Sequence, residues 1–506
     1  MGKCELACVG CREAPRNHAA FPQDIKVADE GGFKFLGAGI GEKEFCEAHT
    51  AARVRKAEKL LQALAKFPDM QTAILLLRQC AAFCKLSYSC RAMPGNDQEQ
   101  ALAVFDGSIR ASFEDITSTC PDDEAWEQAK LAIKKGGIGL RACSEHASAA
   151  YLASRAGTDE LCRKLDPARG QQLASPAALN SALADYNGRV AQEHQLREQP
   201  FNQRQQHLSS KVDGFNADRM VEEAAADPVR QAHLQVLREP GAGHWLQAPP
   251  SEALGLNLPP PLYQIALKRR LRMQLFEQPE FCPRCSEVMD LYGDHALVCR
   301  CGGDIAKRHN AIRNCIFFRC AAGGLNPERE RPGLLPARPE EERQVPAENR
   351  NEATADSSLR RPADVYIPRW RSGVPAALDF AVTSALRSDR VSISSSSGSA
   401  AVRQYAEYKC AFENTRRQCQ DAGIDFVPVV FEAHSGAMEA NARTALYRIA
   451  KAACPEGSDT DINSSVERTT QHVSIILQKE NARAVLRRLV SLEAMREEHL
   501  NAEAHV

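Results

Sequence analysis

The chain has 506 residues, 43% of them hydrophobic, and a formal net charge of −1. This length is typical of about three domains, and the apolar share excludes a wholly disordered chain. The near-zero charge excludes a polycation that binds nucleic acid along its whole length. The 19 cysteines and the lack of a signal-like N-terminus indicate a reducing compartment. The chain has no apolar run of the roughly 18 residues that a membrane span needs.

The first third of the chain predicts a strand followed by helices. Residues 31–41, GGFKFLGAGIG, are typical of a strand and a tight glycine turn, but their GxGxG spacing lacks the second-strand acid of a dinucleotide site. Beyond them, apolar residues recur at helical spacing between Pro and Gly breakers. We expect helices over 44–67, 70–93, 100–117, 125–140 and 144–156. Asp122 and Asp123 precede the fourth helix, where acidic side chains favour a helix N-terminus.

The next segment is polar and then becomes basic. Residues 166–260 are rich in Gln and Arg, and they predict a polar helical linker that is exposed or partly disordered. We expect Trp245 to dock against the domain that follows. Residues 261–276 form an amphipathic basic helix with Lys-Arg-Arg at 268–270. The window 261–320 holds ten Lys/Arg and six Asp/Glu, an excess of +4, which attracts phosphates unless it is an ordinary solvated face.

Four soft metal ligands follow this helix. Cys282 and Cys285 have the spacing of a tight metal-binding turn, and His295 and Cys299 complete the pattern C-x2-C-x9-H-x3-C. Zn²⁺ prefers thiolate and imidazole ligands in a tetrahedron, so the pattern predicts a structural zinc site. Cys301 is an alternative to Cys299, and a set of buried free thiols is the alternative to a metal site.

Two aspartates next to apolar runs suggest a second metal site. VYI at 365–367 and ALDFAV at 377–382 predict buried strands, and the turn residues between them predict a hairpin. The hairpin would bring Asp364 and Asp379 together. Carboxylates bind hard ions such as Mg²⁺, and an acid within an apolar run is costly to bury without a partner. The alternatives are a turn acid at 364 and an arginine-paired acid at 379.

The remaining segments predict a small α/β core. Residues 328–361 are rich in proline and charge and predict a long loop, in which Glu330 is a weak candidate for a third acid. After the acids, the patterns alternate between helix and strand, which favours a mixed sheet covered by helices. We expect a helix over 400–423, a strand over 424–433, a helix over 438–453 and an amphipathic helical tail from 464 that folds back on the core.

The order CPRC, GDHALVC, KRHN, RPAD and LDFAVTS resembles the restriction-like endonuclease domain of site-specific non-LTR retrotransposon polyproteins. That family joins a CCHC knuckle to a PD-(D/E)xK nuclease core. KCEL, FKFLGAGIG and GGIGLR are similar to the end of the polymerase palm and the thumb of the same polyproteins. The resemblance is best over 282–384 and next best over 31–155.

The resemblance implies a multidomain fold: an all-α thumb-like region, a zinc knuckle, and a small α/β mixed-sheet core like that of restriction endonucleases. The implied boundaries are 1–44 for the residual end of the palm, 45–165 for the thumb-like region, 166–260 for the linker, 261–325 for the basic helix and knuckle, 326–455 for the nuclease core with its inserted loop 328–361, and 456–506 for C-terminal helices.

The resemblance also implies the roles of the site residues. Asp364 and Asp379 match the two acids that hold Mg²⁺, but the lysine expected two residues after the second acid is Ala381. Lys409 is the substitute that we expect, with Tyr405 one turn earlier on the same helix face. The residues expected to bind nucleic acid are Lys268, Arg269, Arg270, Arg308, His309 and Arg313.

The implied function is a metal-dependent endonuclease that nicks target DNA in the nucleus to prime reverse transcription. Its partners would be the DNA target and the retroelement RNA. No YxDD-type motif occurs in the chain, so we expect no polymerase activity. The alternatives are a retroelement remnant that binds nucleic acid without cutting it, which Ala381 favours, and a helical interaction protein with an incidental zinc site.

Overall fold

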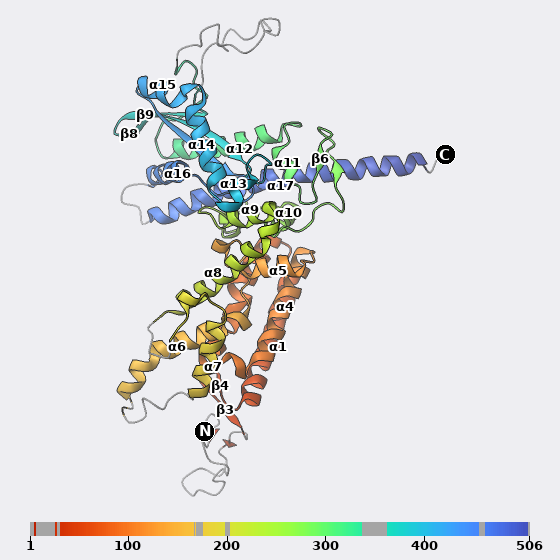
Figure 1. The fold of residues 1–506 in the computed structure, drawn as a ribbon, viewed down its shortest axis with the longest axis vertical. Helices are drawn as coiled ribbons and strands as arrows, with labels where there is room; N and C mark the ends of the chain where they lie inside the picture. Colours follow the sequence, from red (N-terminus) through yellow and green to blue (C-terminus); the bar gives the residue numbers. More distant parts are fainter. Residues whose placement is uncertain are drawn as a thin grey trace. The chain divides into compact units, whose positions relative to one another are not determined.

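The computed structural model describes residues 31–165, 167, 176–197, 203–335, 362–454 and 461–503, together with a parallel pair of two-residue strands, β1 (Glu5–Leu6) and β2 (Lys26–Val27). The chain divides into two compact units, Met1–Arg219 and Met220–Val506 (Figure 1). Both consist mostly of helices, with small sheets. No helix of the described ranges combines the length and the apolar character that crossing a membrane requires.

Residues 31–41 of the first unit form the expected strand and turn. β3 (Gly32–Phe35) and β4 (Ala38–Gly41) form an antiparallel hairpin. Three helices follow near the predicted places: α1 (Lys43–Ala65), α4 (Glu99–Thr117) and α6 (Cys143–Leu165). The helix predicted over 125–140 is shorter, since α5 (Asp123–Lys130) ends before Leu131 and only a 3-10 turn (Ile133–Lys135) follows it. Asp122 is the N-cap of α5, since its side chain accepts a 2.8 Å hydrogen bond from the Ala125 amide.

The helix predicted over 70–93 is instead broken into four pieces. These are α2 (Met70–Leu76), a π-helical turn (Leu77–Ala81), a 3-10 turn (Phe83–Lys85) and α3 (Ser87–Ala92). The amide of Ala82 donates to the carbonyl of Leu77, an i→i+5 bond that marks the π turn. The break allows Leu77, Ala81 and Leu86 all to be fully buried, and apolar spacing alone could not reveal it.

The segment expected to be a polar linker is folded and packed. It contains α7 (Pro176–Asn187), α8 (Gln205–Glu223) and α9 (Pro228–Leu237). Leu183 and Tyr186 of α7 and Leu208 of α8 are buried in one cluster with α6. The few apolar residues of this segment are enough to form a core with α6, because they lie in one cluster. The two units meet in the sequence inside α8, at Arg219 and Met220.

A four-stranded mixed sheet organises the second unit, with strand order β10-β9-β8-β7. β8 (Val365–Arg371) and β9 (Val374–Thr383) form the predicted antiparallel hairpin, in which Val365 pairs with Leu378. β10 (Asp425–Glu432) lies parallel to β9, with Pro428 opposite Asp379. β7 (Glu328–Arg329) adds an edge strand to β8. The start of the predicted 328–361 loop is therefore part of the sheet, while 336–361 lie outside the described residues.

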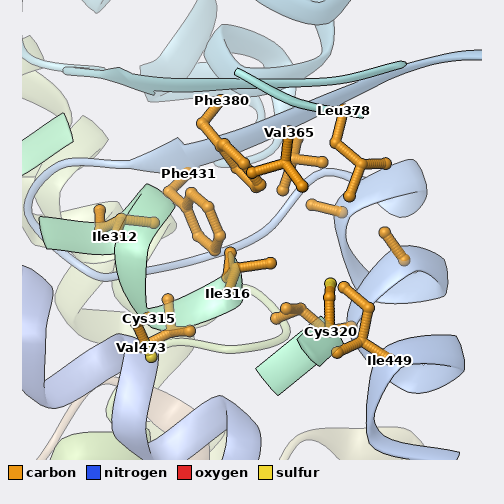
Figure 2. Close-up of a cluster of buried hydrophobic side chains, with 14 of the residues drawn as sticks. Ile312, Cys315, Ile316, Cys320, Val365, Leu378, Phe380, Phe431, Ile449 and Val473 are labelled. Atoms are coloured by element: carbon orange, nitrogen blue, oxygen red, sulfur yellow. The ribbon is translucent and has the colours of Figure 1, made fainter. Parts of the chain in front are cut away.

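Helices cover both faces of this sheet (Figure 1). On one face, α12 (Asp304–Ala322), α16 (Ala440–Ala452) and the long C-terminal helix α17 (Ile462–Glu503) enclose the main core. Figure 2 shows Ile316 of α12 within this core, together with Val365 of β8, Leu378 of β9 and Phe431 of β10. On the other face lie α14 (Ala400–Ala411) and α15 (Thr415–Asp421).

Strand alternation determines which face each side chain of β9 reaches. Leu378 and Phe380 belong to the core with α12 and α16, whereas Ala377 and Ala381 pack toward α15 and α14. Asp379 has the parity of the second set, so its carboxylate is on the side of α14. The connection between β9 and α14 contains the short helix α13 (Val391–Ser396).

Candidate metal centre and acidic site

A short hairpin and a one-turn helix bring the predicted soft ligands together. β5 (Glu280–Phe281) pairs with β6 (Val288–Met289), and Cys282 and Cys285 lie in the turn between them. α11 (Asp294–Val298) carries His295 and is followed by Cys299. The ligand atoms of these four residues all lie within 4.8 Å of one another. Such a cluster could bind a metal such as zinc.

The ligand helix is held by an aspartate that sequence analysis did not identify. Asp290 accepts hydrogen bonds from the amides of Tyr292 (2.8 Å), Asp294 (3.1 Å) and His295 (2.9 Å). Gly293 has a φ of +74°, which glycine adopts without strain. The turn directs Nε2 of His295 to within 3.2 Å of Sγ of Cys285. Burial and the nearby Arg488 lower the pKa of His295, which favours the neutral ring that a metal requires.

The choice between Cys299 and Cys301 is resolved by position. Sγ of Cys299 lies 3.5 Å from Sγ of Cys285 and is buried. Cys301 is exposed and does not belong to the cluster. The cluster therefore has the composition predicted first, with three cysteines and one histidine.

An arginine from the C-terminal helix lies behind the cluster. Arg488 of α17 is fully buried, and its Nη1 donates to Asp304 at 2.7 Å. Its Nε and Nη2 have no hydrogen-bond partner in the described protein, and the guanidinium interacts with the thiols of Cys282 and Cys299. Although burial opposes it, Asp304 and the two thiols raise the pKa of Arg488. Sequence reasoning missed Arg488, because a single arginine in a distant amphipathic helix carries no recognisable signal.

The two predicted acids lie close together on the central hairpin. The amide of Asp364 donates to the carbonyl of Leu378, one residue before Asp379. Oδ2 of Asp364 then accepts a 2.6 Å hydrogen bond from the amide of Phe380, one residue after Asp379. The backbone of β9 thus fixes Asp364 beside Asp379, as the hairpin prediction requires.

Lys409 reaches the acids from the neighbouring helix. Its Nζ lies 2.9 Å from Oδ2 and 3.2 Å from Oδ1 of Asp379. Ala381 is buried against Val402 and Ala406 of α14. The small side chain at 381 therefore allows α14 to approach the sheet, and α14 supplies the lysine that β9 lacks. The predicted substitution of Lys409 for a lysine at 381 agrees with this geometry.

The electrostatics of Asp379 reflect competing surroundings. Burial raises the pKa of Asp379 to about 6, and the negative charge of Asp364 also raises it, while Lys409 and His309 lower it. The same carboxylates raise the pKa of Lys409 against the effect of its burial. Carboxyl groups with a pKa this far above the ordinary value are found most often at functional sites.

His309 occupies a different position from the one expected. It lies on α12, and its Nε2 donates to Oδ2 of Asp364 at 3.1 Å. This hydrogen bond to Asp364 raises the pKa of His309, whereas burial opposes the rise. His309 is thus part of the acidic site itself, where it orients Asp364.

Three of the arginines expected to bind DNA are buried, and that expectation is wrong for them. Arg308 is 5% exposed and donates to Oδ1 of Asn481 (2.9 Å) and the carbonyl of Leu297 (3.0 Å). Arg269 is buried against Nδ1 of His434 at 3.0 Å, and Arg270 is buried as well. Arg308 and Arg269 thus connect packed elements of the second unit through these acceptors, and the burial of Arg270 removes it from the surface as well.

The other candidate cations have mixed positions. Lys268 is half-buried on α10 (Pro260–Arg270). Arg313 of α12 forms an ion pair with Glu330, whose amide donates to the carbonyl of Asp364 at 3.1 Å. Glu330 is therefore adjacent to the acidic site, but its carboxylate is turned to Arg313, which weakens its case as a third metal ligand.

Neither the scan of protein-family models nor the search of curated proteins finds a match to this chain. The function of the two sites therefore has to be argued from their chemistry.

Proposed function

We propose that the second unit is a Mg²⁺-dependent DNA endonuclease of the kind found in non-LTR retrotransposon polyproteins. The observation that carries this proposal is the convergence of Asp364, Asp379 and Lys409 from three different elements. Two carboxylates with an adjacent lysine are the groups that metal-dependent phosphodiester cleavage uses. The chain lacks a YxDD-type motif, and the proposal includes no polymerase activity.

The donor set suits a hard divalent ion. Oδ1 of Asp364 accepts no hydrogen bond from the described residues. The carboxylate of Asp379 accepts hydrogen bonds only from Lys409 among these residues. Mg²⁺ commonly binds through one or two carboxylates and completes its shell with water and substrate phosphate. When bound, the ion would activate water and stabilise the leaving oxygen.

The chain's own groups have separate tasks in this proposal. His309 and the Phe380 amide hold Asp364 in place next to Asp379. Lys409 carries a positive charge at the site and would polarise water or stabilise the negative charge that develops on the phosphate. For Mg²⁺ to bind both Asp364 and Asp379, the ion pair between Lys409 and Asp379 would have to open.

The soft cluster is proposed to bind structural Zn²⁺. Four protein ligands would complete the coordination of Zn²⁺ without an open position, as in structural rather than catalytic zinc sites. α17 contacts both this cluster, through Arg488, and the nuclease core, through Val473 and Leu477. The metal would stabilise the unit that carries the acids. The proposed partners are a chromosomal DNA target, in the nucleus, and retroelement RNA.

Nicking of supercoiled plasmid DNA with Mg²⁺ tests the proposal. Wild-type chain should convert supercoiled to open-circular DNA, and the isosteric Asp379→Asn variant should lose this activity by at least about 100-fold, because the metal loses a charged ligand. Asp421→Asn, at the exposed end of α15, is the matched control and should nick normally.

The second candidate, a remnant that binds DNA without cutting, rests on Ala381. The same experiment separates the two functions when DNA binding is measured in parallel. Binding of DNA by wild-type chain with no nicking under any divalent metal would support the remnant and overturn the nuclease.

A further inference from the structure

A row of three aromatic side chains, each ring tilted against the next, leads outward from the acidic site. Tyr405 and Tyr408 of α14 have ring centroids 5.7 Å apart, and Tyr408 and Phe412 have centroids 5.5 Å apart. Tyr408 is 52% exposed and Phe412 is 45% exposed. The spacing i, i+3, i+7 places the three rings along one side of the helix. We call these three residues the aromatic row.

The inner end of the row belongs to the site. Tyr405 packs against the cluster of Ala381 and Val402, and it lies within electrostatic range of Lys409. The guanidinium of Arg390 lies 4.9 Å from the centre of the Tyr405 ring, a cation–π geometry. The row therefore starts beside the lysine that contacts Asp379 and ends at the solvent.

The backbone beyond the row is strained. Glu413 and Asn414 both have a positive φ, of 50° and 53°, where α14 gives way to α15. This conformation is uncommon for glutamate, and such residues persist where the surroundings hold them. α14 ends at Ala411, and the bend at Glu413 and Asn414 follows directly after Phe412, whose ring lies against Tyr408.

Ordinary packing does not explain the two outer rings. Tyr408 and Phe412 are the large hydrophobic side chains that α14 and its C-terminal turn expose, and the exposed Arg403 is on the same helix. Two glutamates, Glu407 and Glu413, are also close, so charge alone does not identify a ligand. Exposed aromatic rings with cations nearby, next to a site proposed to cleave phosphodiesters, are typical of surfaces that bind unpaired bases.

We propose that the aromatic row stacks with unpaired bases of the DNA strand next to the scissile phosphate, an inference that rests on the proposed nuclease function. Bases in intact duplex are already stacked on each other and cannot use such a row. The preferred substrate is accordingly DNA that is locally melted or single-stranded at the cut, and not fully paired duplex.

Binding can be measured separately from cutting. The probe is a duplex with a short non-complementary bubble that contains 2-aminopurine, compared with the fully paired duplex, in Ca²⁺ buffer. Wild-type chain should bind the bubble more tightly and change the 2-aminopurine fluorescence on stacking. Tyr408→Ala and Phe412→Ala should each weaken bubble binding by about 5- to 100-fold, as expected for loss of one stacked base, with duplex binding unchanged.

Matched variants keep the test specific. Tyr408→Phe retains the ring and should bind the bubble as wild type does. Tyr447→Ala removes a comparably exposed aromatic, 45% exposed on α16, and should have no effect. Equal wild-type affinity for bubble and duplex, or equal losses for both in Tyr408→Ala, would overturn the inference. Failure of nicking with intact bubble preference would instead overturn only the nuclease assignment.

Discussion

Arg488 offers a sharp test of the soft cluster, because one buried side chain joins it to the rest of the unit. The variant Arg488→Met keeps most of the side-chain length and removes the charge. Three thiolates and one neutral histidine around Zn²⁺ carry a net charge of −1, by the charges of the ligands. Arg488 is the buried cation that interacts with two of these thiols.

The expected loss of zinc affinity in Arg488→Met follows from the contact between Arg488 and the ligand thiols. Groups that support metal ligands typically contribute about 10- to 100-fold to metal affinity, and we expect a loss in this range. Asp304 keeps an ion pair with Arg487 in the variant, so its carboxylate is not left alone. Arg488→Lys should recover part of the affinity, since it restores the charge without the fork of N–H donors.

Zinc affinity is measured by competition with a chromophoric chelator, and zinc content by mass spectrometry under native conditions. Arg483→Met is the matched control, because this arginine is on the same helix, is half-exposed and pairs with Glu480. The assigned role would be refuted if folded Arg488→Met bound zinc within about twofold of the wild-type affinity, because that loss is far smaller than the expected one.

Three further predictions concern stability. Chelation of the cluster metal should lower the thermal midpoint of the second unit and leave that of the first unit unchanged. Calorimetry should then show two resolved unfolding transitions, and a single transition at an unchanged temperature would contradict this prediction. Ala381→Lys should lower the free energy of unfolding by about 2–4 kcal/mol, because a long cation replaces a buried alanine beneath α14. Urea titration measures this free energy, and an unchanged unfolding midpoint would contradict the prediction. Burial lowers the pKa of His146 to about 3, while an unfolded histidine titrates near about 6.5. The stability from its neutral ring is therefore complete above that value and decreases as the pH falls, by about 2 kcal/mol at pH 5. His146→Leu should remove this slope in urea titrations at several pH values, and an unaltered slope would show that other groups carry it.

The parts of the structure that could be predicted from sequence are those with local signals. The C-x2-C-x9-H-x3-C spacing needed only a tight turn and one helical turn to bring the four ligands within reach. The β8–β9 hairpin followed from two apolar runs and a turn. Lys409 was selected from the resemblance, which implies that a neighbouring helix supplies a substitute for the lysine absent at 381, and Lys409 of α14 does contact Asp379.

The parts that could not be predicted depend on long-range packing. Basic residues at 269, 270 and 308 look solvent-exposed in a sequence, yet all three are buried, and Arg269 and Arg308 contact His434 and Asn481, which are far along the chain. The polar segment after 166 contains few apolar residues, but Leu183, Tyr186 and Leu208 meet in one cluster. Which partners such residues find is decided by tertiary contacts that no short pattern contains.

The central claim is that Asp364 and Asp379 bind one divalent cation between them. Replacement of Mg²⁺ by Fe²⁺, followed by ascorbate and peroxide, cleaves a protein backbone close to the bound iron. The account predicts fragments that end near both residues 364 and 379, suppressed by excess Mg²⁺ and absent in Asp379→Asn. Fragments near only one of the two acids, or an identical pattern in Asp379→Asn, would contradict it.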